Sequence, residues 1–178
     1  WTFKFGANWR RPLGGISDLR GRLDHPVVHV AWSDAKAYAD WAGLDLASEA
    51  EWEFAARGGS ESEYAWGEEF APGGKAMANT WQGVFPTRST KPKGEERTSA
   101  VRSFPPNGYG LYDMAGNVWE WTSDGFAPHH AADAPKACCV PLNPRGGSRP
   151  GSLDPITPDI PVPRRVLKGG SHLCAPNY

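Results

Sequence analysis

The spacing of apolar residues along the chain predicts two helices. In residues 33–43, Ser33 is a candidate N-cap, Gly43 favours the left-handed conformation that ends a helix, and apolar side chains fall at i, i+3, i+4 and i+7 (Ala35, Tyr38, Ala39, Ala42). In residues 48–59, Ser48 and Glu51 have the spacing of a capping box, and two glycines end the segment. We expect these to be the only substantial helices.

Three shorter runs are typical of strands. Residues 27–32 (VVHVAW) are rich in β-branched and aromatic side chains, residues 119–121 follow a turn-forming stretch, and residues 164–174 return as an apolar run. Between them, residues 60–106 are mostly loop with scattered aromatics, and the polar stretch 88–102 predicts a mobile surface loop. The pattern therefore indicates a turn-rich domain with little regular secondary structure.

The composition agrees with one folded domain. The chain has 178 residues, of which 21 are Gly and 17 are Pro, and nine Trp supply much apolar area per residue. Its 19 basic and 20 acidic residues form no basic block, so we expect neither nucleic acid nor a membrane as a partner. No apolar run approaches the roughly 20 residues of a membrane span, and residues 1–10 have no signal-peptide pattern. The chain does not begin with Met, and we expect a fragment that is incomplete at both ends.

The three cysteines leave at least one thiol without a partner inside the chain. Cys174 follows a Gly-Gly-Ser turn at the end of an apolar run, where a thiol could act as a ligand or a nucleophile. Spacing alone favours the more common alternative, which is a buried and inert cysteine. The neighbours Cys138 and Cys139 could bind a soft metal, form a strained disulfide or simply pack, and their role stays open.

A second pattern places two carboxylates seven residues apart around a Gly-Asn turn. Asp113, Gly116, Val118 and Glu120 form a D-x-x-G-x-V-x-E sequence, and hard oxygen ligands of this kind suit Ca²⁺. The alternative is a surface turn with two solvated acids, which the pattern alone favours.

Other chemical signatures are weak or absent from the sequence. His25 and His29 lie in the predicted strand and would not share a helix face as a metal pair, and Asp124, His129 and His130 are consistent with plain surface positions. The sequence contains no phosphate-binding glycine loop, no G-x-S-x-G, no H-E-x-x-H and no C-x-x-C. These absences disfavour the common nucleotide-binding and hydrolase classes.

Several runs taken together carry one specific resemblance. They are GANWRRP (6–12), DHPVVHVAWSDAKAYADWAG (24–43), SEAEWEFAARGG (48–59), ANTWQGVFP (78–86), FPPNGYGLYDMAGNVWEWTSD (104–124) and KGGSHLCAPNY (168–178). Their order and spacing resemble the formylglycine-generating enzyme, or sulfatase-modifying factor, family in its bacterial form. The resemblance implies one irregular, loop-rich α+β domain over residues 1–178, related to C-type lectin-like domains, stabilised by Ca²⁺ and poor in regular secondary structure.

The resemblance also implies an activity. Members of the family oxidise a cysteine in a C-x-P-x-R segment of a nascent or unfolded sulfatase to Cα-formylglycine, using O₂ and Cu(I) held by two thiolates. It assigns Cys174 as a copper-binding catalytic thiolate, Ser171 as a residue beside the oxygen-activating pocket, and Trp119 as a residue that lines the substrate site. We expect a monomer in the bacterial cytoplasm, by the same resemblance.

Two calcium sites are implied as well. The first uses Asp113 and Glu120 with the carbonyls of Gly116 and Val118. The second uses Asn79, the carbonyl of Thr80 and an Asp-Gly-Phe loop, which this chain replaces with KPKGEER, so that Lys93 stands where the acid is expected. A lysine there would repel Ca²⁺, which argues against the second site.

The family pattern continues C-x-x-x-x-C and places the partner thiolate directly after Tyr178. We therefore expect these 178 residues alone to bind Cu(I) weakly and to turn over little or no peptide. The main alternative is a non-catalytic peptide- or ligand-binding relative on the same fold, and such relatives tend to lack the cysteine. A sulfoxide synthase of the same fold would need a helical domain with iron-binding histidines, which the sequence does not contain.

Overall fold

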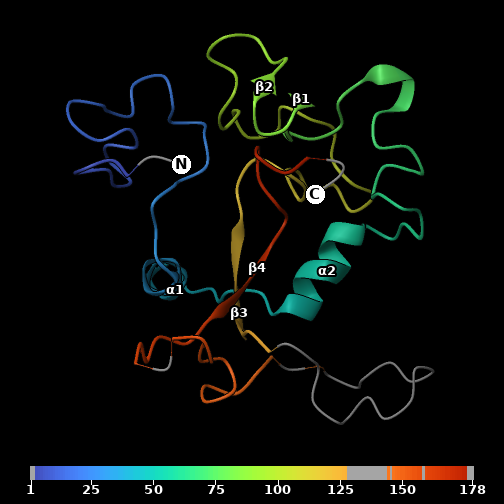
Figure 1. The fold of residues 1–178 in the computed structure, drawn as a ribbon. Helices are drawn as coiled ribbons and strands as arrows, with labels where there is room; N and C mark the ends of the chain where they lie inside the picture. Colours follow the sequence, from blue (N-terminus) through green and yellow to red (C-terminus); the bar gives the residue numbers. More distant parts are fainter. Residues whose placement is uncertain (1–2, 128–143, 145, 158, 176–178) are drawn as a thin grey trace.

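Two short helices lie on either side of a two-stranded antiparallel ribbon (Figure 1). The computed structural model describes residues 3–127, 144, 146–157 and 159–175. The helices are α1 (Trp32–Trp41) and α2 (Glu49–Arg57), and the ribbon pairs β3 (Glu120–Gly125) with β4 (Arg165–Lys168). A small hairpin of β1 (Gly83–Val84) and β2 (Arg88–Ser89) and a 3₁₀ turn η1 (Pro72–Gly74) complete the regular structure of the described residues. The predicted α+β class with little regular structure is confirmed.

Helix α2 forms as its sequence predicts. The backbone N–H of Ser48 donates to Glu51 Oε2 at 2.8 Å, and the N–H of Glu51 donates back to Ser48 Oγ at 3.3 Å. Gly58 ends the helix in the left-handed conformation, with φ of 58°. The buried residue Trp52 faces the ribbon and donates its indole N–H to Glu120 Oε2 at 2.8 Å, and this hydrogen bond ties the helix to β3.

Helix α1 differs from the prediction at its start. It begins at Trp32, one residue before the predicted cap Ser33, and Asp34 Oδ2 accepts the N–H of Ala31 at 2.8 Å. The strand expected over residues 27–32 is wrong, because His29 has φ of 57° and extended backbone cannot continue through it. The left-handed stop at Gly43 is confirmed, with φ of 70°.

Indole groups, and not strand pairing, connect the segment at residues 27–32 to the ribbon. Trp32 donates its indole N–H to the carbonyl of Thr122 at 2.8 Å, and Trp121 donates its own to the carbonyl of Val30 at 3.1 Å. Thr122 is fully buried and donates its hydroxyl to the carbonyl of Val166. The aromatic residues therefore replace longer strands as connectors.

The ribbon confirms the two other predicted strands, with shifted ends. Glu120 pairs with Lys168 and Trp121 with Leu167, and the register is irregular before Gly125. The strand that was expected to reach Cys174 ends at Lys168, because Gly169 and Gly170 have φ of 88° and 75°. After β4 the chain turns toward the segment that precedes β1, as Figure 1 shows.

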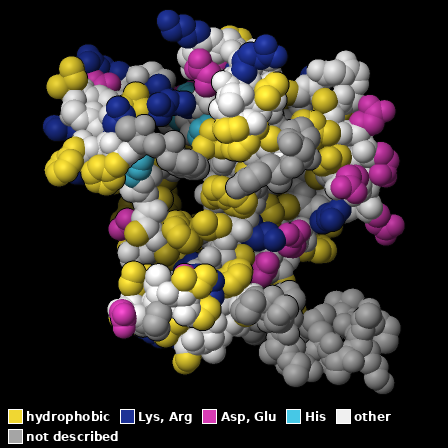
Figure 2. All heavy atoms as spheres, viewed as in Figure 1, with side chains coloured by type: hydrophobic (Ala, Val, Ile, Leu, Met, Phe, Trp, Pro, Cys, Tyr) yellow, Lys and Arg dark blue, Asp and Glu magenta, His cyan; other side chains and the backbone are white. Residues whose placement is uncertain are grey.

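The described surface carries both charge signs. Figure 2 shows acidic side chains along one edge and basic side chains mainly on the opposite upper part, with hydrophobic groups between them. No helix in the described part of the chain is long and apolar enough to cross a membrane.

Candidate active site and cation sites

The turn after β4 holds Cys174 through its own backbone. The N–H of Ser171 points at Cys174 Sγ at 3.2 Å, and the N–H of Cys174 donates to the carbonyl of Ser171 at 2.9 Å. Gly170 allows this tight turn, since a Cβ atom on it would lie 3.3 Å from Sγ. The thiol is free, partly exposed and in contact with one N–H donor, which distinguishes it from a fully buried core cysteine.

Ser171 lies beside this thiol, whereas Trp119 is largely exposed. Ser171 is buried, with its Oγ 3.9 Å from Cys174 Sγ, and the same hydroxyl accepts the N–H of Leu173. Trp119 is 51% exposed, and the hydrogen bonds that fix Cys174 come from the turn itself and from the N–H of Trp81, which donates to the carbonyl of Cys174 at 2.8 Å. The structure therefore brings Cys174 and Ser171 together, and the described hydrogen bonds of Cys174 do not involve Trp119.

Two residues that the sequence analysis did not single out connect this turn to the rest of the domain. The carbonyl of Asn117 accepts the backbone N–H of His172 at 3.0 Å and lies 3.0 Å from His172 Nδ1. Burial lowers the pKa of His172, the hydrogen bond to Asn117 opposes this, and the charges of Lys91 and Arg97 lower it further. The only sequence signal was Asn117 itself, in a Gly-Asn turn where its φ is 61°.

The first expected calcium site places two carboxylates close together. Burial raises the pKa of Glu120, the indole N–H of Trp52 lowers it, and the negative charge of Asp113 raises it. Asp113 Oδ2 accepts the N–H of Arg102 at 2.7 Å. Within the described residues, neither acid has a salt-bridge partner.

Two backbone carbonyl groups between these acids are also available as ligands. Among the described residues no hydrogen bond reaches the carbonyl oxygens of Gly116 or Val118. The described part of the chain contains no group of three or more His, Cys, Asp or Glu side chains that could hold a metal. The expected calcium site has only two such side chains, and its other ligands would be backbone carbonyl oxygens. These acids and carbonyls are oxygen donors of the kind that Ca²⁺ takes, and calcium at this site stays a prediction.

At the second expected calcium site, the ammonium group of Lys91 lies beside Asn79. Asn79 is 4% exposed, and its side-chain oxygen accepts a hydrogen bond from the ammonium group of Lys91. Lys93, which the sequence placed at this site, is exposed. A lysine does occupy the region, two residues earlier than expected, and the residues present do not fit a second Ca²⁺.

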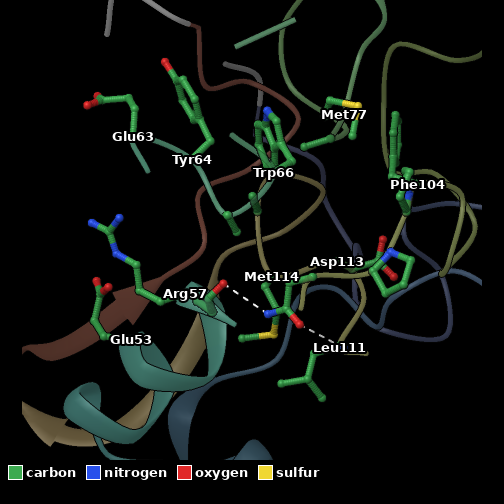
Figure 3. Close-up of a pocket in the computed structure, with 17 residues that line it drawn as sticks. Glu53, Arg57, Glu63, Tyr64, Trp66, Met77, Phe104, Leu111, Asp113 and Met114 are labelled. Carbon is green, nitrogen blue, oxygen red and sulfur yellow. Dashed lines mark hydrogen bonds between the residues drawn. The ribbon is translucent and has the colours of Figure 1, made fainter. Parts of the chain in front are cut away.

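A cavity of about 220 Å³ lies beside the first cation site (Figure 3). Trp66, Met77 and Phe104 provide apolar walls, while Asp113 forms part of its boundary. Cys174 is not among its lining residues. The cavity is therefore separate from the candidate catalytic thiol.

Gly116 is expected to be among the most sensitive positions of the site. Its φ is 74°, and a Cβ atom would lie 2.4 Å from the carbonyl oxygen of Asn79. Gly116→Ala should lower the free energy of unfolding by about 2–5 kcal/mol, from the left-handed backbone together with the clash. Gly110→Ala is the control in chemical denaturation, because Gly110 has φ of 76° and open space around it, and it should lose only about 1–2 kcal/mol. Equal losses in the two variants would contradict the close approach at Gly116.

The sequence is similar to one known protein family over its whole length. Residues 1–178 match the family described as "Sulfatase-modifying factor enzyme 1-like domain", and the chain belongs to this family. It is 52% identical over 179 residues to the formylglycine-generating enzyme of Mycobacterium tuberculosis, covering 100% of this chain and 56% of that protein. It is also 50% identical over 122 residues to the inactive C-alpha-formylglycine-generating enzyme 2 of Bos taurus, covering 67% of this chain and 40% of that one.

A solved structure agrees with the fold. Treponema denticola variable protein 1 matches with a TM-score of 0.61 and 25% identity, over 97% of this chain and 69% of that chain. The chain spans about half the length of the curated relatives it matches.

Proposed function

We propose that the protein containing this chain converts a cysteine in a C-x-P-x-R segment of an unfolded sulfatase polypeptide to Cα-formylglycine, with O₂ as the oxidant. The observation that carries this proposal is the position of Cys174 in the turn after β4, where its thiol is free and receives the N–H of Ser171. The relatives named as formylglycine-generating enzymes support the substrate class.

We propose that Cys174 would be one of the thiolate ligands of Cu(I), because a soft metal ion selects soft sulfur ligands. Bound copper would supply the one-electron chemistry that lets O₂ react with a thiol substrate. The chain's own part is to hold and orient the Cys174 side chain. The N–H of Ser171 lies 3.2 Å from Sγ and helps to orient it, and the Ser171 hydroxyl, 3.9 Å from Sγ, offers a polar group beside the reacting sulfur.

The alternative function is non-catalytic binding of a peptide or another ligand. The inactive relative of Bos taurus supports it, because it is as similar in the matched region as the enzymes are. Cys174 and its N–H donor favour the oxidase, since a pure binding module has no use for an oriented free thiol. Action as a monomer in the bacterial cytoplasm belongs to the same proposal and rests on the family resemblance.

Mass spectrometry tests the oxidase directly. The full-length protein is incubated with a C-x-P-x-R peptide, Cu(I), O₂ and a thiol reductant that supplies the electrons the substrate does not. We expect the peptide mass to fall by the difference between a CH₂–SH group and an aldehyde, and the product to react with a hydrazide. An unchanged peptide, with peptide binding retained, would favour the non-catalytic alternative.

A further inference from the structure

The amide of Asn79 uses its polar atoms inside the protein. Its Nδ2 donates to the carbonyl of Arg97 at 3.0 Å and to Asn117 Oδ1 at 3.1 Å. Its Oδ1 accepts from the ammonium group of Lys91, which lies on the loop after β2. Asn117 is only 2% exposed and also accepts the N–H of Ser99 on Oδ1. These groups form a buried cluster of amides with one charged member.

We infer that the Lys91 ammonium group is the resident cation of this cluster and occupies the place of a divalent ion beside Asn79. Calcium requires six to eight oxygen ligands at about 2.3–2.6 Å, and the Asn79 oxygen already faces the ammonium group. The described hydrogen-bond partners of the two asparagine side chains are amide, carbonyl and ammonium groups, with no carboxylate. A divalent ion here would gain few anionic ligands and would be repelled by the lysine.

Nearby charges agree with a cation at this position. Burial lowers the pKa of Lys91 overall, and the negative charges of Glu95 and Glu96 oppose this shift and favour the ammonium form. The Ser99 hydroxyl is buried without a hydrogen-bond partner among the described residues, but one neutral oxygen does not replace the acidic ligands that calcium needs.

Hydrogen bonds connect the cluster to the turn that carries Cys174. Asn79 binds Asn117 through its side chain and also accepts the backbone N–H of Asn117 at 2.8 Å. The carbonyl of Asn117 then holds His172, two residues before Cys174. Lys91 is therefore a positioning residue, because it fixes the cluster to which the turn is tied without any metal. This inference does not depend on the proposed oxidase activity.

A calcium-binding measurement distinguishes this inference from its alternative, in which a Ca²⁺ ion binds beside Asn79. The Glu120→Gln background removes an acid of the first site, so that any remaining binding reports on the Asn79 cluster. In that background we expect no calcium-dependent rise in Tm, and we expect Lys91→Asp to create one. Lys93→Asp is the matched control, since Lys93 is exposed on the same loop, and it should create none.

Two outcomes would overturn the inference. The first is stoichiometric calcium binding in Glu120→Gln that disappears in Asn79→Ala, because an ion would then occupy the cluster beside Lys91. The second is a folded Lys91→Asp variant that gains no calcium response. If Lys91→Asp does not fold, the measurement on Glu120→Gln alone still decides.

Lys91→Met tests the structural role without adding an acid. It leaves the Asn79 oxygen without its donor and should lower Tm by about 3–10 °C, whereas Lys93→Met should leave Tm unchanged. With Cys138 and Cys139 replaced by Ser, alkylation of Cys174 should be several-fold faster in Lys91→Met than in Lys93→Met. Equal alkylation rates would refute the positioning role.

Discussion

Cys174→Ser is expected to abolish conversion of a C-x-P-x-R peptide, with a loss of at least about 100-fold in turnover. Serine has nearly the same shape, but its hydroxyl does not ionise near neutral pH and is a poor ligand for a soft metal. The measurement is the rate of aldehyde formation in the full-length protein at fixed copper and O₂.

The variant should keep its fold, which makes the loss informative. The turn is fixed mainly by backbone hydrogen bonds, including the N–H of Trp81 to the carbonyl of Cys174 at 2.8 Å, and these do not need the sulfur. We therefore expect the free energy of unfolding to change by less than about 1.5 kcal/mol. Cys174→Ala should give the same loss of turnover. If Cys174→Ser keeps turnover within about 10-fold of the parent, another group must carry the chemistry. Cys138 and Cys139, which lie outside the described residues, would be the first to test.

The elements that depend on local sequence were predictable. Helix α2 carries its start and stop signals within a few residues, with Ser48 and Glu51 at one end and Gly58 at the other, and all three act as expected. The strands around Trp121 and Leu167 were also found. Their ends were missed, because a strand ends where its partner ends and pairing is not a local property.

The failure over residues 27–32 has the same origin. Valines and a tryptophan fit a strand, but here Trp32 begins a helix and its indole bonds to Thr122, ninety residues away. The irregular backbone at His29 is stabilised by tertiary contacts, including its ring nitrogen 2.9 Å from the carbonyl of Pro12. Tertiary structure overrides β propensity in such a segment.

The site shows the same division between local and distant information. The pattern from Asp113 to Glu120 and the turn at Cys174 are contiguous in sequence, so a resemblance could place them. The links through Asn79, Asn117 and His172 join three separate segments and have no sequence signature. Lys91 was missed in favour of Lys93 for a related reason, because aligning a loop without a gap does not fix which of two lysines turns inward.

Calcium should stabilise the protein strongly, and its removal should cause a large fall in Tm. The ligands that the family resemblance implies are Asp113, Glu120 and the carbonyls of Gly116 and Val118. With free Ca²⁺ at about 100–1,000 times Kd, binding contributes about 3–4 kcal/mol, and a chelator should lower Tm by about 6–16 °C. Glu120→Gln should abolish this difference, because Gln keeps an acceptor for the Trp52 indole but removes the charge. Glu61→Gln, at an exposed glutamate, is the matched control and should leave the calcium response unchanged.

The calcium effect should also depend on pH in a defined direction. Burial and Asp113 raise the pKa of Glu120 in the metal-free fold, so the folded state holds this proton more tightly than the unfolded state does. The stabilisation from the protonated acid is therefore fully present below the unfolded pKa of about 4.3 and is lost as the pH rises through the higher folded value. Bound calcium would replace the proton and remove the repulsion between the two acids. Consequently the difference in Tm with and without calcium should grow as the pH rises through that window, and Glu120→Gln should flatten it. A difference that is constant across the window, or that shrinks as the pH rises, would show that Glu120 is not a calcium ligand.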